Sequence, residues 1–162
     1  MSGLPDSMSG VQMVGHGGPE MLHWNTAIPV PVPVRGEVLI RVSASAVNNT
    51  DINTRVGWYS KSGDPEDGSW TGEALGFPRV QGIDACGRIE AVGDGVDPAR
   101  IGQRVLVEPC LREARGRKLD RPWFLGSECD GAFAQYLTVA ARHAWPIDSD
   151  LSDAELATFP CS

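Results

Sequence analysis

The chain has 162 residues, of which 41% are hydrophobic and 22% charged, values ordinary for a globular protein with one adequate core. Its 14 lysines and arginines stand against 21 acidic residues, so the formal net charge is −7. Because nucleic-acid binding relies on a basic surface, this balance excludes nucleic acid as the main partner. The sequence also contains no long apolar run that would suggest a membrane segment.

Residues 1–10 contain neither a basic start nor an apolar run, so they are not a signal peptide, and we expect them to form a disordered tail. The cysteines at positions 86, 110, 129 and 161 form no Cys-x-x-Cys pair. Without an export signal, they are expected to be reduced thiols in a cytoplasmic protein. The histidines at positions 16, 23 and 143 share no ligand spacing, and none is a catalytic candidate.

Several strands are predicted in order along the chain. Residues 11–14 and 20–24 form two opening strands around a Gly-Gly-Pro turn. Alternate residues of the run 29–34 are prolines without an N–H, which indicates an extended polyproline link, with a proline-recognition motif as the alternative. Residues 37–47 alternate apolar and polar side chains and predict a strand. Further strands are expected within residues 85–92, 105–108 and 131–139.

Two short helices are predicted from their capping patterns. Residues 49–51 can cap a helix over residues 51–56, which Gly57 ends. Within it, Asp51 and Arg55 have the i, i+4 spacing of an ion pair. Near the end of the sequence, residues 152–155 form a capping box that opens a second helix.

Residues 78–96 predict a turn, a strand and a second turn, and their glycines could be interpreted as phosphate-binding or as structural. Gly82 and Gly87 are spaced like the ends of a phosphate-binding loop, but Arg88-Ile89 stands where Lys-Ser/Thr is required, so we interpret both glycines as structural. The motif Gly-Ile-Asp-Ala-Cys-Gly at 82–87, followed by Gly-Gln-Arg-Val at 102–105, resembles the medium-chain dehydrogenase/reductase superfamily. Further blocks in the family's order, at residues 47–59 and 131–136, strengthen this resemblance.

The resemblance implies a mainly β fold, the GroES-like, partly open β-barrel of the family's N-terminal catalytic domain, with a few short helices. It would cover residues 11–146, and residues 147–162 would start the connection to a cofactor-binding domain. No Gly-x-Gly-x-x-Gly follows a predicted strand, so NADP(H) or NAD(H) would be bound mainly by a domain outside these residues. We therefore expect a fragment that is inactive alone; a natural stand-alone barrel is the alternative.

The metal ligands of the zinc-dependent members are missing. Those members carry a cysteine where Asn48 stands and a His-Glu pair where residues 83–84 read Ile-Asp. A catalytic zinc needs about three Cys, His or carboxylate ligands, so we expect no zinc. Two cysteines near residues 110–128 likewise do not complete a four-cysteine structural site, and this insertion is expected to be a metal-free loop. The pattern resembles most closely the zinc-free quinone oxidoreductase branch.

The same resemblance assigns candidate site residues. It places Asn48 and Tyr59 in the cleft beside the nicotinamide and the substrate carbonyl, where an amide and a phenol can donate hydrogen bonds to developing negative charge. Asn48 and Asp51 are also the expected cofactor contacts, although Asn48 as a helix cap and Asp51 as a complement to the helix N-terminus are the structural alternatives. Trp58, Tyr59 and Trp70 are candidates for the substrate pocket, or anchors of a loop.

The predicted function is therefore the substrate-side domain of a zinc-independent NAD(P)H-dependent oxidoreductase that reduces a quinone, an enone or another activated carbonyl. The alternatives are a zinc-type alcohol dehydrogenase with altered ligands and a non-catalytic GroES-like binding module. The expected partner is a small molecule, and a homodimer of the full-length protein is compatible with the resemblance.

Overall fold

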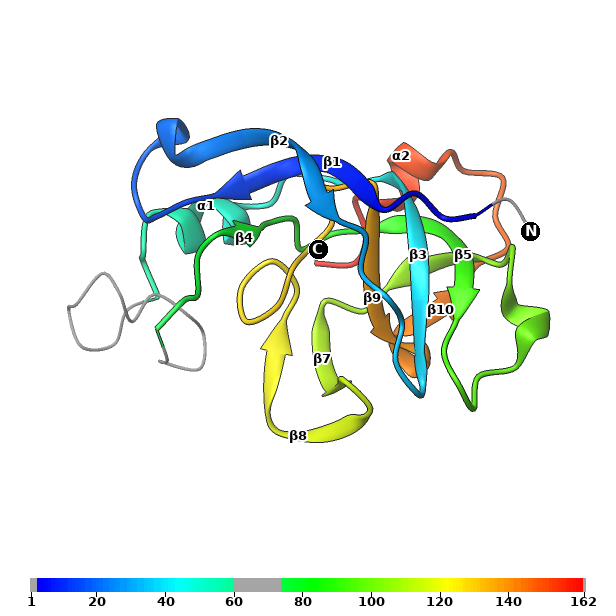
Figure 1. The fold of residues 1–162 in the computed structure, drawn as a ribbon. Helices are drawn as coiled ribbons and strands as arrows, with labels where there is room; N and C mark the ends of the chain where they lie inside the picture. Colours follow the sequence, from blue (N-terminus) through cyan, green and yellow to red (C-terminus); the bar gives the residue numbers. More distant parts are fainter. Residues whose placement is uncertain (1–2, 60–73, 162) are drawn as a thin grey trace.

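The computed structural model describes residues 3–59 and 74–161, in which the chain is mainly β (Figure 1). In one sheet, β1 (Ser7–Met13) lies between β2 (Leu22–Pro29) and β4 (Arg79–Val80). A larger sheet has the order β10 (Ala144–Pro146), β6 (Arg104–Val107), β5 (Cys86–Val92), β3 (Glu37–Ala44) and β9 (Tyr136–Ala140). The described sheets are not joined into a closed barrel, which confirms the predicted partly open, mainly β architecture.

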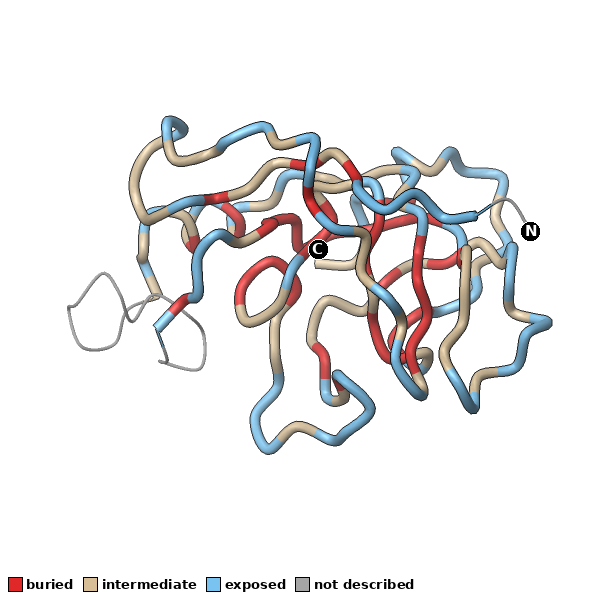
Figure 2. The backbone as a smooth tube through the Cα atoms, in the orientation of Figure 1, coloured by how far each residue is buried: buried red, intermediate tan, exposed pale blue. Residues whose placement is uncertain are grey.

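Strand β3 lies at the centre of the core, so both of its faces are buried. Figure 2 shows the buried residues concentrated along β3 and β9 and in the loops beside them. Val38 and Ile40 pack on one side in the largest cluster, as the predicted alternation requires. Leu39 faces the other side and packs in a second cluster with Met8, Ile28, Val80 and Tyr136. The sheet that contains β1 and β2 therefore covers a face that would otherwise be exposed to water.

The N-terminal strand starts earlier than predicted, at Ser7, so the expectation of a disordered tail is wrong for residues 7–10. Ser9 forms two hydrogen bonds with Gln135: its N–H donates to Oε1 at 2.9 Å and its C=O accepts from the backbone N–H at 3.1 Å. These partners lie far away in the sequence and cannot be read from local composition. The second strand starts later than predicted, because Pro19–Met21 form a 3-10 turn before β2.

The insertion 110–128, predicted to be a loop, contains a β-hairpin of β7 (Cys110–Ala114) and β8 (Arg117–Phe124). Its two turn residues, Arg115 and Gly116, have positive φ angles of 53° and 72°. This is the backbone of a type I′ turn, which matches the twist of paired strands. Many side chains on β8 are charged and exposed, so this segment lacks the alternation of apolar and polar residues from which a strand is predicted.

The predicted strand over 131–139 becomes regular only at Tyr136, because its first residues bind another loop. The N–H groups of residues 131–133 donate to the carbonyls of residues 80–82 at 2.7 to 2.9 Å. Gly82 has a φ of +106°, and a side chain on Gly82 or Gly131 would collide with the facing backbone. Both glycines are thus required by a close approach of two chain segments, and this approach positions residues 83 and 84.

Two short helices, α1 (Asn49–Arg55) and α2 (Asp153–Leu156), complete the fold. Neither helix, in the part of the chain that the structure describes, is long or apolar enough to cross a membrane. The capping box predicted at residues 152–155 is present and opens α2.

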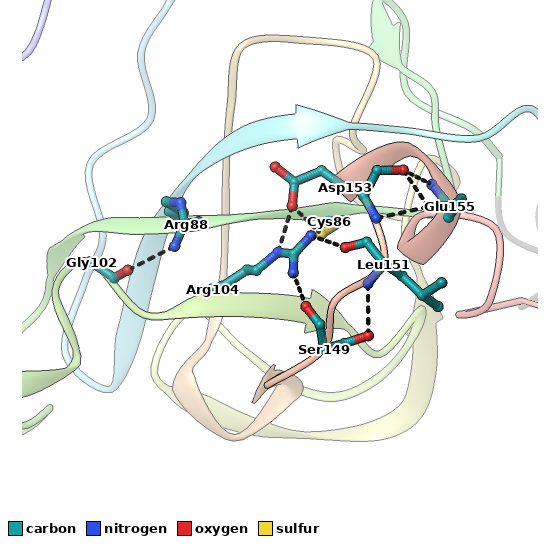
Figure 3. A network of polar contacts seen from close by, with 9 residues as sticks. Cys86, Arg88, Gly102, Arg104, Ser149, Leu151, Asp153 and Glu155 are labelled. Carbon is teal, nitrogen blue, oxygen red and sulfur yellow. Dashed lines mark hydrogen bonds and ion pairs between the residues drawn. The ribbon is translucent and has the colours of Figure 1, made fainter.

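Arg104 joins the segment before α2 to the large sheet (Figure 3). Its Nε donates to the Asp153 carboxylate at 2.6 Å, while its two terminal nitrogens donate to the carbonyls of Ser149 at 2.8 Å and Leu151 at 2.6 Å. Beneath this contact, Leu156 packs against the buried Cys86 of β5. One guanidinium therefore holds three points of the C-terminal segment on the sheet.

Candidate active site

Asn48 caps α1 and is held from several directions. Its backbone is extended, its Oδ1 accepts from the Thr50 N–H at 3.0 Å, and its own N–H donates to Asp51 Oδ2 at 3.0 Å. This reciprocal pair is a capping box. The structural role that the sequence allowed for Asn48 is therefore present, independently of any role in catalysis.

Asp51 joins α1 to the loop that follows β4. Its side chain is only 5% exposed, and Oδ1 accepts hydrogen bonds from the backbone N–H groups of residues 82–83, both at 3.1 Å. Burial raises the pKa of Asp51 although these N–H groups oppose the shift. The predicted ion pair with Arg55 is wrong, because Asp51 faces the loop while Arg55 Nε donates to the Gly17 carbonyl at 3.3 Å.

Asp84 connects Asn48 to the end of the chain. Asp84 Oδ1 accepts from the Cys161 N–H at 2.7 Å, and Oδ2 accepts from Asn48 Nδ2 at 3.3 Å. Asn48 Nδ2 also donates to the Cys161 carbonyl at 3.2 Å, which closes a triangle of hydrogen bonds. Figure 1 shows the C-terminal end beside the loop that follows β4. Asp84 is thus a structural hydrogen-bond acceptor, and the contribution of Cys161 could not be read from the sequence because only the fold brings it here.

The residues around this triangle do not fit a catalytic zinc. Ile83 carries no donor atom and is buried in the interior, and the Asn48 oxygen already accepts from Thr50. Burial and the charge of Asp84 raise the pKa of the Cys161 thiol, which disfavours the thiolate that a metal requires. Within residues 3–59 and 74–161, no three His, Cys, Asp or Glu side chains gather as a metal site.

Tyr59 and Trp58 follow the C-terminal end of α1. Their rings meet edge to face with centroids 5.3 Å apart, and Asn53 Nδ2 donates to the Tyr59 hydroxyl at 3.4 Å. Trp58 is 69% exposed, and the nearby Val47, Ile52 and Val56 are exposed as well. Trp70 lies outside the described residues. The structure thus groups two of the three predicted pocket residues.

Helix α1 separates the two predicted catalytic residues. Asn48 precedes its first residue and Tyr59 follows its last by four positions, so a helix about 10 Å long lies between them. The arrangement offers an amide at one end, a phenol at the other and exposed apolar side chains along the helix.

Comparison with known proteins assigns the fold to a family. The alcohol dehydrogenase GroES-like domain family matches residues 34–149. The chain is 31% identical over 147 residues to an L-threonine 3-dehydrogenase of Stenotrophomonas maltophilia, covering 84% of this chain and 39% of that protein. It is 29% identical over 144 residues to a quinone oxidoreductase of Lama guanicoe, covering 89% and 34%. The chain belongs to the alcohol dehydrogenase GroES-like domain family, within the medium-chain dehydrogenase/reductase superfamily that the sequence predicted.

Solved structures agree, and some carry ligands. A candidate alcohol dehydrogenase of Sinorhizobium meliloti 1021 superposes with a TM-score of 0.84 at 43% identity, over 96% of this chain and 44% of that one. An Escherichia coli alcohol dehydrogenase, rspB, solved with NADH, gives 0.74 at 25% identity over 95% and 42%. A cobalt- and zinc-bound alcohol dehydrogenase of Pyrobaculum aerophilum gives 0.74 at 26% over 95% and 44%. The chain therefore spans about two fifths of these proteins, which are oxidoreductases of one superfamily.

Proposed function

We propose that these residues form the substrate-side domain of a zinc-independent NAD(P)H-dependent oxidoreductase that reduces a quinone, an enone or another activated carbonyl. The observation that supports the zinc-free reaction is the closed hydrogen-bond triangle of Asn48, Asp84 and Cys161 beside the aliphatic Ile83. By the resemblance, zinc-dependent members hold a cysteine ligand at the position of Asn48 and a His-Glu pair at the positions of Ile83 and Asp84. Here the polar atoms satisfy one another, and the thiol favours its protonated form.

The nicotinamide cofactor, held mainly by a second domain, supplies a hydride, and the reduced acceptor gains that hydride and one proton from solvent. The task of this domain is to position the acceptor and to stabilise its oxygen as negative charge develops. The Tyr59 hydroxyl, beyond the C-terminal end of α1, is the first donor we propose for that oxygen. Asn48, at the other end of α1, is the alternative donor, and it can serve only if it exchanges its bond to the Cys161 carbonyl for one to the acceptor.

Zinc analysis tests the metal-free part of the proposal. The chain, purified and dialysed without chelator, should carry no stoichiometric zinc by elemental analysis. A variant with both Asn48→Cys and Ile83→His is the matched control, because with Cys161 it offers three ligands and should gain zinc. One tightly held zinc per unmodified chain would show that the reaction belongs to the zinc-dependent type.

A turnover measurement tests the division of labour between domains. Residues 1–162 alone should oxidise NADPH negligibly with quinone acceptors, because hydride transfer needs cofactor and acceptor held together. The assembled enzyme, in which these residues are joined to a nicotinamide-binding domain, should reduce the same acceptors. Robust turnover by residues 1–162 alone, or no turnover by the assembled enzyme with quinones, enones and related carbonyls, would contradict the proposal.

A further inference from the structure

A cavity of 470 Å³ lies away from the candidate active site, between the proline-rich segment 29–34, the hairpin of β7 and β8, and β9. Its volume is within the range of small-molecule sites in proteins. Neither Asn48 and Asp84 nor Tyr59 and Cys161 line it. The cavity is therefore not formed by the proposed donor residues.

The greater part of the wall is apolar. Ile28, Val34 and Leu111 contribute aliphatic surface, and Trp123 of β8 contributes an aromatic ring. Val32, also on the wall, is 80% exposed, so an apolar side chain stands at the border with solvent. Such a lining favours a ligand with an apolar body that displaces water from these side chains.

Two arginines supply the polar part of the wall. Arg115, in the hairpin turn, stacks its guanidinium on Trp123 with 5.6 Å between Cζ and the ring centroid. Among the described residues, no carboxylate lies within ion-pair distance of that guanidinium. Arg79, in β4, pairs through Nη1 with Asp130 at 3.0 Å, but its Nε is buried and has no hydrogen-bond partner in the described chain.

The carboxylates of the wall are already occupied by other donors. Glu37 accepts from the N–H groups of Arg115 at 2.7 Å and Val34 at 3.2 Å through its two oxygens. Asp130 accepts from the Val80 N–H at 3.0 Å as well as from Arg79. Among the described residues of the wall, the Arg115 guanidinium, on an exposed residue, remains as a cationic donor without a carboxylate partner.

Cys129 is a further residue of the cavity wall. Its thiol lies in the wall, and burial raises its pKa to about 12 although the charges of Arg79 and Arg115 oppose this shift. The thiol is therefore neutral at physiological pH, and it adds no negative charge to compete for the arginines.

We propose that this cavity binds an amphipathic organic carboxylate. The carboxylate would lie beside the Arg115 guanidinium, with Arg79 as the second cation of the wall, and the apolar body would lie along Ile28, Val34 and Leu111. An uncharged ligand of equal length cannot form the charge-assisted hydrogen bond to Arg115 that a carboxylate can form.

Binding of decanoate, at concentrations where it is monomeric, tests the proposal by isothermal titration calorimetry on the whole chain. Decanoate should bind at least tenfold more tightly than decan-1-ol, and decyltrimethylammonium should bind least, because a charge-assisted hydrogen bond is lost with both. Amide signals of Val34, Ala114 and Val139 should shift on titration in ¹H–¹⁵N NMR spectra, since these residues line the cavity.

Four variants locate the interaction. Arg115→Gln should weaken decanoate about 10- to 100-fold, and Arg79→Gln, which removes the second cation of the wall, should weaken it by a smaller factor. Ala114→Phe should abolish binding by filling the cavity. Arg117→Gln, exposed on the same hairpin and absent from the wall, is the matched control and should change affinity less than about twofold.

Thermal melts show which variants remain folded, and only those are compared. The proposal is overturned if decanoate does not bind, if decan-1-ol binds as tightly, or if folded Arg115→Gln binds like the unmodified chain. It is also overturned if the shifted amides cluster at α1 and Tyr59, which would place the ligand at the candidate active site instead.

Discussion

The backbone N–H of Cys161 donates to the Asp84 carboxylate at 2.7 Å although 77 positions separate the two residues. Asn48 reaches both partners through one amide nitrogen. Three segments that are far apart in the sequence thus meet at the start of α1: the residues that follow β3, the loop before β5 and the C-terminal segment. Because Asn48 is both a helix cap and a member of this triangle, its proposed catalytic role can be tested only with substitutions that separate these functions.

We expect Asn48→Ser to separate capping from donation. Serine is as good an N-cap as asparagine, but its side chain lacks the amide donor. If Asn48 donates to the acceptor, kcat/KM of the assembled enzyme should fall roughly 10²- to 10³-fold in both Asn48→Ser and Asn48→Ala. Asn48→Ala should in addition be about 1 kcal/mol less stable than Asn48→Ser, because it also loses the cap.

Steady-state kinetics and urea denaturation of both variants provide the measurement. Tyr59→Phe, which removes only a hydroxyl, is the companion variant and should also lower kcat rather than raise KM alone. If Asn48→Ser keeps nearly full turnover, Asn48 is a cap and a structural donor, and Tyr59 remains the candidate.

Arg104→Lys should lower the free energy of unfolding by about 1–3 kcal/mol. Lysine keeps the charge but cannot reproduce the three-way contact with Asp153, Ser149 and Leu151, so hydrogen bonds to the partly buried Asp153 and Ser149 and to the exposed Leu151 are lost. Arg88→Lys is the control shown beside it in Figure 3: Arg88 is exposed and makes one 3.4 Å contact with the Gly102 carbonyl. Its substitution should change stability by less than about 0.5 kcal/mol. Equal losses in the two variants would contradict this role of Arg104.

As the pH falls, one carboxyl should lose its contribution to the free energy of unfolding, whereas two others should gain in theirs. Partial burial disfavours the charge on Asp153, but the hydrogen bond and charge of Arg104 outweigh it and hold the pKa of Asp153 below its ordinary value. Asp153 therefore adds stability that is complete above the unfolded pKa of about 3.9 and is lost as the pH falls below it. Burial raises the pKa of Asp51 and Asp84, so their contribution is most favourable below about pH 3.9 and is lost as the pH rises through their folded pKa values.

Urea denaturation between about pH 3 and 7 measures the first effect. The deficit of Asp153→Asn relative to the unmodified chain should be largest near neutral pH and should shrink as the pH falls. Carboxyl ¹³C titration by NMR measures the second: Asp51 and Asp84 should titrate above about 3.9 and Asp153 below it. A deficit of Asp153→Asn that is independent of pH would refute the assigned interaction with Arg104.

Glu37→Gln should destabilise the protein by about 1–3 kcal/mol, because an amide at this buried position has only one acceptor oxygen for two N–H donors. Those donors belong to Arg115 in the hairpin turn and Val34 in the proline-rich segment, so this carboxylate holds the two together. Glu113→Gln is the matched control: Glu113 pairs at 3.0 Å with Arg142, whose side chain is 59% exposed, and this pair is worth about 0–1 kcal/mol. Chemical denaturation of both variants measures their free energies of unfolding. Similar losses of that free energy in the two variants would mean that Glu37 does not hold the hairpin turn to the proline-rich segment.

Much of the architecture could be predicted from local patterns. The alternation of β3, the capping residues of α1 and α2 and the motif around Gly82 each follow from backbone chemistry within a few residues, and the ordered motifs indicated the superfamily. The predictions failed where pairing depends on distant partners. Ser7 to Gly10 became a strand through β2 and residues 134–135, and the charged insertion became a hairpin attached to the rest of the fold.

His143 illustrates the limit most clearly. Its position in the sequence offers no ligand spacing and indicates no functional role. In the structure its ring is 1% exposed, Nε2 accepts from the N–H groups of Arg112 and Glu113 at 3.1 and 3.2 Å, and Nδ1 lies 2.9 Å from Glu108 Oε2. Since Nε2 is an acceptor, the proton belongs on Nδ1, where it is donated to the carboxylate. This ring supports the hairpin, a role that no linear pattern encodes.

The sequence by itself determined the local elements, the superfamily and the identity of the side chains at the positions of the zinc ligands. Only the tertiary structure decided which of those side chains have atoms left for a ligand: Asn48 and Asp84 are joined through Cys161, while Arg79 and Arg115 face a shared cavity. The physical reason is that motif chemistry acts through residue type over short spacings. Hydrogen-bond saturation and desolvation depend instead on neighbours that the folded chain brings from far along the sequence.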